Sequence, residues 1–165
     1  MDYFAHGFWS YIFFNKSKTS WLAVLFGLLP DSTSWLIYFF VRLFTNGLSF
    51  GKPNFTTLPN WINTLYGLSH SLVICGAIFL IVYLVLKRIP IYMFAWPIAI
   101  VMDIVTHTKE FLPTPFLYPI SNWHFPGISW GTSTFMLINW GLIVGILSYI
   151  LVKKKWYNKL GEEKK

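Results

Sequence analysis

The chain has 165 residues, of which 55% are hydrophobic, 21% are aromatic and only 12% are charged. Soluble domains contain about 25% charged residues, so this composition excludes an ordinary soluble domain and predicts an integral membrane protein. The formal net charge of +7 does not indicate nucleic-acid binding, because the basic residues stand at the ends of apolar segments, as topology signals do. The single cysteine, Cys75, excludes an intramolecular disulfide and a thiolate metal cluster.

The first two apolar segments are too short to cross a bilayer alone. Residues 3–15 would cover about 20 Å as a helix, whereas the hydrocarbon core is about 30 Å thick. Lys16 and Lys18 close this segment, and a second helix over 21–29 is expected to end at Pro30 and Asp31. The pattern predicts a short N-terminal helical hairpin.

The middle of the chain predicts two helices after a loop. An aromatic helix over 35–44 could lie on the membrane surface, and 46–63, rich in Gly, Pro and Asn, reads as a loop. Residues 67–86 are long and apolar enough for a complete span, with His70 in its first turn. The next helix should begin at Pro90 and reach about residue 108, with a kink at Pro97.

The C-terminal part predicts a loop and a final span. Residues 111–130 are rich in Pro and aromatics, which is typical of an interfacial loop or lid. Residues 132–152 form the clearest span, which the lysines at 153–155 should stop. We therefore predict an all-α polytopic membrane bundle with about three full spans, a short N-terminal hairpin and a Pro/aromatic-rich outer loop. Residues 1–152 would form one transmembrane domain, and 153–165 a basic cytoplasmic tail.

Charge asymmetry predicts the orientation. If the basic ends of the apolar segments all face the cytoplasm, only Arg42, Lys52 and Lys109 of the 13 basic residues lie on the other side. By the positive-inside rule this predicts a multi-pass protein of the bacterial inner membrane with a cytoplasmic C-terminus. Membrane lipids are then its expected partners, and the sequence does not indicate an oligomeric state.

The stretch WPIAIVMDIVTH, residues 96–107, carries the most informative residues. Asp103 and His107 stand at i and i+4, so a helix places them on one face. A carboxylate within an apolar segment is costly and needs a specific partner. We expect the partners to be His6, Asp31 and His70, because counting from the inner anchors at about 1.5 Å per residue puts all of these residues in the outer half of the membrane.

Histidines and carboxylates together are the ligands of zinc and of related catalytic divalent metals. Such an ion lowers the pKa of a bound water and polarises a carbonyl or phosphoryl oxygen, so hydrolysis is the natural chemistry. The candidate metal ligands are His6, Asp31, His70, Asp103 and His107. Asp31 and Asp103 are also the candidate catalytic residues, with a divalent metal, zinc first, as cofactor.

Five motifs in order carry a resemblance to a known family. They are His6 in AHGFW, the LLPD turn at 28–31, SHS at 69–71, Asp103 on its helix and TPFLYP at 114–119. At these residues the chain resembles the bacterial membrane-bound metal-dependent hydrolases, which include inner-membrane proteins linked to the DNA-damage regulon. The resemblance implies a metal-dependent hydrolase, with a lipid-like or other amphiphilic ester or phosphoester near the outer leaflet as its expected substrate.

The chain departs from the family pattern at three ligand positions. Thr33 stands where a second acid is expected after the LLPD aspartate, and Ala99 where a histidine is expected before Asp103. Leu65 and Tyr66 stand where a further histidine is expected. His107 could replace the histidine lost at Ala99, and a metal-free, non-catalytic relative is the alternative.

Each candidate also has an ordinary structural explanation. Asp31 could cap a helix, His70 could belong to a hydrogen-bonded cap, and His6 could be an interfacial residue. His107 could be a solvated histidine, and His124 a loop residue that covers a site from above. Three classes of function stay open on the sequence: a metal hydrolase, a small transporter or proton-relay protein, and a non-catalytic membrane scaffold.

Overall fold

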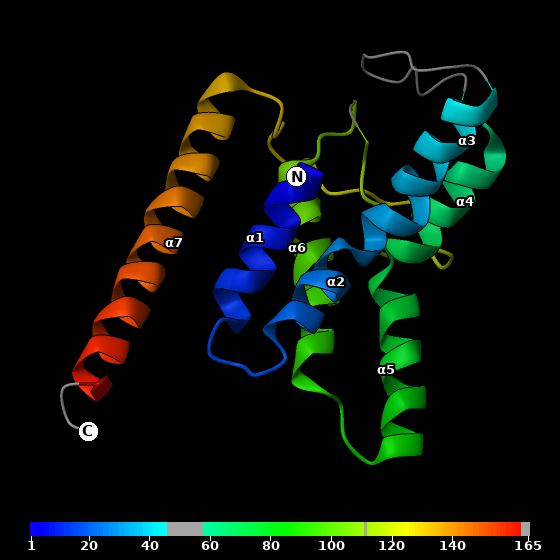
Figure 1. Cartoon of the computed structure of the whole chain (residues 1–165). Helices are drawn as coiled ribbons and strands as arrows, with labels where there is room; N and C mark the ends of the chain where they lie inside the picture. The colour runs from blue at the N-terminus through cyan, green and yellow to red at the C-terminus, as the bar shows by residue number, and fades with distance from the viewer. Residues whose placement is uncertain (46–57, 111, 163–165) are drawn as a thin grey trace. The chain divides into compact units, whose positions relative to one another are not determined.

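The computed structural model describes the backbone of residues 1–45, 58–110 and 112–162. In these ranges every regular element is a helix, as predicted (Figure 1). The chain divides into two compact units, Met1–Trp130 and Gly131–Lys165. We describe each unit by itself.

Helices α1 (Tyr3–Phe14) and α2 (Ser20–Asp31) pack against each other as the predicted N-terminal hairpin (Figure 1). Asp2 caps α1, because its side chain accepts a hydrogen bond of 3.0 Å from the backbone N–H of Ala5. Gly27 allows the close approach of α2. A Cβ atom at this position would lie only 1.8 Å from Oγ of Ser10 on α1.

The α-helix α2 ends at Asp31, as predicted, but the helical path does not stop there. The chain continues through a π-helix (Ser32–Leu36) into α3 (Ile37–Thr45), and the 26 residues Ser20–Thr45 are long and apolar enough to cross a membrane. The hydroxyl groups of Thr33 and Ser34 form hydrogen bonds inside this continuous helical segment. Thr33 Oγ1 donates to the carbonyls of Leu29 and Pro30, both at 3.0 Å, and Ser34 Oγ donates to that of Pro30 at 3.1 Å. Such bonds favour the wider turn of a π-helix.

Residues 67–86, predicted as one complete span, do not form one continuous helix. They belong to two helices, α4 (Asn60–Ser69) and α5 (Leu72–Leu86), which meet at a bend of 55°. Ser71 makes the break, because its extended backbone leaves the helix and its Oγ caps α5 by accepting from the N–H groups of Val73 and Ile74. His70 therefore lies at the break rather than in a first helical turn.

Two neighbouring predictions change with this break. Residues 60–63, expected in a loop, form the start of α4, whereas residues 46–57 of that loop lie outside the described residues. After Pro90 the chain makes a short 3₁₀-helix (Ile91–Phe94) and then α6 (Ala95–Thr106), which ends two residues before the expected end. Pro97 lies in the first turn of α6, where its missing N–H leaves no hydrogen bond unmade.

The loop predicted at the C-terminal end of α6 is confirmed for residues 112–130, which contain turns but no helix or strand. Its far end returns to α6. Backbone N–H groups of the loop donate to three carbonyls that the end of a helix leaves without partners. The pairs are Gly127 N to His107 O (3.1 Å), Ile128 N to Val105 O (2.9 Å) and Trp130 N to Thr106 O (3.0 Å).

The second unit contains one helix, α7 (Ser133–Glu162). The lysines at 153–155, expected to end the span, do not end the helix, since lysine is itself a good helix former. Its segment Ser133–Trp156 is the second helix able to cross a membrane. The described part of the chain therefore has two candidate spans, or three if the bent pair of α4 and α5 is one span, against the three full spans expected.

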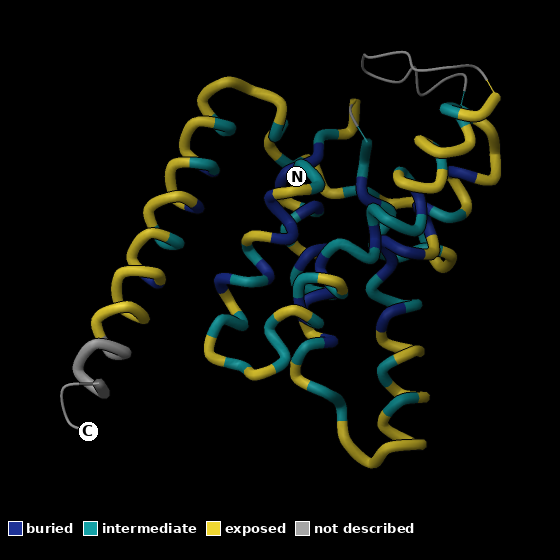
Figure 2. Tube along the Cα trace, viewed as in Figure 1, coloured by how far each residue is buried: buried dark blue, intermediate teal, exposed yellow. Residues whose placement is uncertain are grey.

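The first unit has a small apolar core between α5 and α6. Cys75 of α5 packs with Trp96 and Ile100 of α6, and the indole N–H of Trp96 donates to the carbonyl of Ser69 at 2.8 Å. The rest of α5 exposes apolar side chains, as the yellow and teal colours of Figure 2 show. An apolar helix with an exposed surface suits contact with lipid.

Candidate functional site

The structure brings together the ionisable residues that the sequence placed at one depth. His6 comes from α1, Asp31 from the last residue of α2, His70 from the break between α4 and α5, and Asp103 from α6. His107 ends α6, one turn after Asp103. Four of these side chains are buried, and that of Asp31 is 13% exposed. We call these five residues the His–Asp cluster.

Histidines and carboxylates alternate around the cluster. Nε2 of His6 lies 2.9 Å from Oδ1 of Asp103 and 3.9 Å from Oδ2 of Asp31. Nε2 of His70 lies 3.5 Å from Oδ2 of Asp103 and 3.5 Å from Oδ1 of Asp31. Each carboxylate therefore lies between the same two imidazoles. His107 completes the set, with its Nε2 3.7 Å from Oδ1 of Asp103.

A hydrogen bond from Nδ1 to the backbone fixes the orientation of the His70 ring. Its Nδ1 lies 3.1 Å from the carbonyl oxygen of Tyr66, and a carbonyl only accepts, so Nδ1 is the donor. In a neutral imidazole Nε2 is then an acceptor, and here it faces two carboxylate oxygens. Nε2 of His70 and Oδ2 of Asp103 are both buried without a hydrogen-bond partner. Electron-rich atoms in this arrangement require a positive charge between them, either a proton or a cation.

His107 is held in place by the loop and by α4. Its Nδ1 lies 3.0 Å from Oγ1 of Thr114 and 3.4 Å from the hydroxyl of Tyr66. On the other edge of the ring, Nε2 lies 3.1 Å from the amino group of Met1, which also donates to Oδ1 of Asp103. A positively charged nitrogen thus lies on this side of Asp103, whereas Oδ2 faces His70.

The sequence did not reveal the role of Tyr66. This residue stands where the resemblance to the hydrolases led us to expect a histidine. Its ring packs on that of His70 with centroids 4.0 Å apart and planes inclined by 32°. An aromatic residue four positions before a histidine on a helix was the available signal, because i and i+4 share a face. The other departures take no part in the cluster: Thr33 bonds to helix carbonyls, and Ala99 is a buried methyl group on α6.

The residue types of the cluster are those that bind divalent cations, but their side chains are not arranged as a complete metal site. Among the described residues, no group of three or more His, Cys, Asp and Glu side chains is arranged as an assembled metal site. The donor set is nevertheless that of zinc. Three cluster atoms are buried without a hydrogen-bond partner among the described residues, Nδ1 of His6, Nε2 of His70 and Oδ2 of Asp103, and the last two face each other. The second nitrogen of His70 donates to a backbone carbonyl, as is usual for metal-binding histidines.

Comparison of the chain with protein-family models, curated proteins and solved structures gives no match. The likeness to membrane-bound metal-dependent hydrolases thus rests on the motifs given above. Three of those motifs, at His6, Asp31 and His70, each contribute a side chain to the His–Asp cluster with Asp103.

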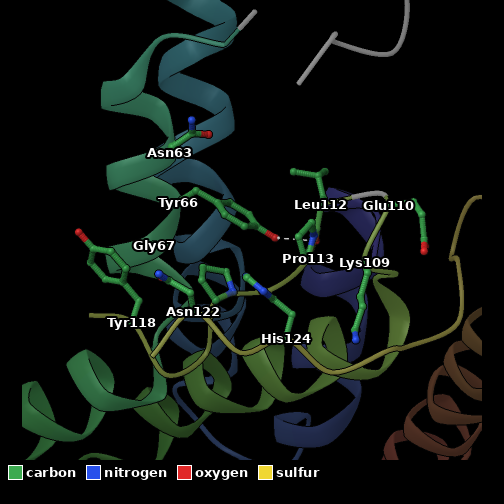
Figure 3. A pocket seen from close by; sticks show the side chains of 11 residues that line it. Asn63, Tyr66, Gly67, Lys109, Glu110, Leu112, Pro113, Tyr118, Asn122 and His124 are labelled. Atoms are coloured by element: carbon green, nitrogen blue, oxygen red, sulfur yellow. Dashed lines mark hydrogen bonds between the residues drawn. The ribbon is translucent and has the colours of Figure 1, made fainter. Parts of the chain in front are cut away.

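His124 lies outside the cluster. It lines a cavity of about 410 Å³ between α4 and the loop, together with Tyr66 and Lys109 (Figure 3). Partial burial and the positive charge of Lys109 lower the pKa of His124 below its ordinary value. His124 is therefore a loop residue, and that it covers a site stays a prediction.

Proposed function

We propose that the protein is a membrane-embedded, metal-dependent hydrolase that holds a divalent cation, zinc first, in the His–Asp cluster. Its substrate class would be an ester or phosphoester of an amphiphile. The observation that carries this proposal is the facing of His70 Nε2 and Asp103 Oδ2, two buried atoms without hydrogen-bond partners. A cation between them would remove the unfavourable contact and use both atoms as ligands.

Two pairs of ligand atoms in the cluster have a spacing close to that of zinc ligands, although the described residues form no group of three arranged to hold an ion. Atoms that share a tetrahedral zinc ion at about 2.0–2.1 Å lie about 3.3–3.4 Å from each other. Nε2 of His70 is 3.5 Å from each of its two carboxylate oxygens, on Asp31 and Asp103. These three residues would hold the ion, and His6 and His107 would complete or orient the set.

The cation would supply Lewis-acid polarisation of the substrate oxygen and an activated water. The chain itself would supply positioning and proton transfer. Asp31 is the only cluster member whose side chain is partly exposed, so it is the carboxylate best placed to accept a proton from water. Asp103 is buried on α6 among His6, His70 and His107, and would hold the cluster together.

Metal content tests the proposal directly. The full-length protein, purified in detergent without chelators, should contain about one zinc per chain by elemental analysis, or take up one zinc on titration. Protein that neither contains nor takes up zinc, manganese or iron would contradict the proposal.

The same contacts favour one alternative, a metal-free proton relay. His6 and Asp103 are at hydrogen-bonding distance, 2.9 Å, and a second proton on His70 would also supply the positive charge that the two carboxylates need. A relay would respond to a proton gradient. A change of internal pH in proteoliposomes under an imposed gradient, in the absence of any bound metal, would favour this alternative over hydrolysis.

The membrane location has its own support. Two described helices are long and apolar enough to cross a membrane. Placement in the bacterial inner membrane, with the C-terminus in the cytoplasm, is part of the proposal and rests on the distribution of basic residues.

A further inference from the structure

The cavity beside the cluster has the size and composition of a small-ligand site. It lies between α4 and the loop after α6, with a volume of about 410 Å³ (Figure 3). Pockets of a few hundred cubic ångströms with a few polar groups are typical of sites for small ligands. We call it the headgroup pocket, and its lining residues that carry the argument are Asn63, Tyr66, Lys109, Asn122 and His124.

Tyr66 links this pocket to the His–Asp cluster. The side chain lines the pocket, its ring packs on His70, and its hydroxyl lies 3.4 Å from Nδ1 of His107. A molecule in the pocket would therefore be separated from two cluster histidines by a single side chain.

The polar groups of the pocket suit an anion with several oxygens. Lys109 provides an ammonium, His124 an imidazole, and Asn63 and Asn122 amide N–H groups. Lysine is a common point-charge binder of phosphate. The lining also contains one acid, Glu110, which follows Lys109 in the chain and lies at the edge of the labelled side chains in Figure 3. Lys109 and His124 line the same cavity, one with an ammonium group and the other with an imidazole N–H.

The surroundings of the pocket favour an amphiphile over a fully soluble ligand. The loop that forms one wall exposes the large apolar side chains of Ile120 and Trp123. Exposed apolar groups next to a polar pocket are suited to acyl chains beside a headgroup.

We infer that the headgroup pocket binds the phosphate group of an amphiphilic phosphoester, with Lys109 and His124 on its oxygens, and holds that group beside the His–Asp cluster. This assigns a substrate class to the proposed function, and it rests on that function for the reaction that follows binding. The binding itself needs no metal.

Binding of short-chain phosphatidic acid to the full-length protein in detergent tests the inference. Isothermal titration should show binding of dihexanoyl phosphatidic acid, and Lys109→Met should weaken it roughly tenfold, the usual worth of one charge-assisted contact. Lys87→Met, at the far end of α5, is the matched control and should leave binding unchanged. Equal weakening by both substitutions would indicate general surface attraction and overturn the inference.

Two further ligands separate headgroup from tail. Dihexanoylglycerol, which lacks the phosphate, should bind at least tenfold more weakly than phosphatidic acid, and so should glycerol phosphate, which lacks the tails. Equal binding of dihexanoylglycerol would overturn the anionic pocket. Equal binding of glycerol phosphate would overturn the amphiphile as the ligand.

The same titration on chelator-treated protein keeps the two proposals apart. Binding that persists without metal supports the headgroup pocket whether or not the protein takes up zinc. A protein that takes up zinc but does not bind phosphatidic acid would refute the substrate class and leave the metal-dependent hydrolase standing.

Discussion

Nε2 of His70 and Oδ2 of Asp103 lie 3.5 Å apart, buried, and neither atom has a hydrogen-bond partner. These residues are far apart in the chain and come from a helix break and from α6. A buried acceptor pair is expensive unless a proton or a cation lies between the two atoms. The chemistry of the protein depends on which of the two it is.

Removing either partner should remove the metal. Asp103→Asn keeps the shape of the side chain but takes away its charge, and His70→Ala takes away the facing nitrogen. We expect each variant to lose most of the bound zinc, measured by elemental analysis after gel filtration. His124→Ala is the control, since His124 lines the headgroup pocket rather than the cluster, and it should keep its metal.

Folding must be checked in the same samples. Helical circular dichroism and elution volume should match wild type in Asp103→Asn. A variant that stays folded and keeps full zinc occupancy would remove Asp103 from the ligand set.

Gly127→Ala should destabilise the first unit. A Cβ atom there would lie 2.4 Å from the carbonyl oxygen of His107 and 2.7 Å from that of Val105, closer than atoms can pack. Forced overpacking costs about 1–3 kcal/mol, which a lower thermal midpoint in detergent would report. Gly76→Ala is the matched control, because a Cβ atom there meets nothing within 4 Å. That substitution should be neutral or stabilising, since alanine favours a helix by about 1 kcal/mol over glycine.

The pKa of His124 should respond to Lys109. Burial comes first and the charge of Lys109 second in lowering this pKa, so Lys109→Met should raise it toward the ordinary value of about 6.5. NMR titration of the ring protons measures the change, with Lys87→Met as control. A pKa that is lower in the folded protein means that protonation opposes folding, so a small part of stability is lost as the pH falls through about 6.5.

Reporter fusions test the orientation. A fusion after residue 155 should report the cytoplasm, and a fusion within residues 112–130 should report the periplasm, because all but three of the 13 basic residues then lie inside. The reverse pattern would move the headgroup pocket to the cytoplasmic leaflet and change the lipids available to it.

That the side chains of the His–Asp cluster meet could be predicted, because the sequence shows directly which ionisable residues lie within apolar segments, and burying an ionised group without a partner is costly. A carboxylate such as Asp103 within an apolar segment needs partners, and His6, Asp31 and His70 were the ionisable residues at the same depth. Their function as metal ligands stays a prediction. The distances between them depend on packing, which no count along the chain provides.

The local structure was harder to predict, because single hydrogen bonds decide it. Ser71 breaks a long apolar segment by capping α5, whereas Thr33 and Ser34 keep a helix going past Pro30. The hydroxyl group of Ser or Thr can accept a hydrogen bond from a backbone N–H group that follows it in the chain, or donate one to a backbone carbonyl that precedes it. Composition does not say which, so the break at His70 and the π-helix after Asp31 could only be seen in the structure.

The loop after α6 is attached to the protein at both ends of the cluster. Its carbonyl at Phe116 accepts from Leu72 N at 2.9 Å, next to the helix break, and its N–H at Gly127 donates to the carbonyl of His107. The loop is therefore joined by backbone hydrogen bonds to Leu72, close to His70, and to His107 itself. Amide exchange should show these protons opening together as one cooperative unit, at a single rate. Ligands would then reach the His–Asp cluster past the side chain of Tyr66, because the loop would stay attached to the helices.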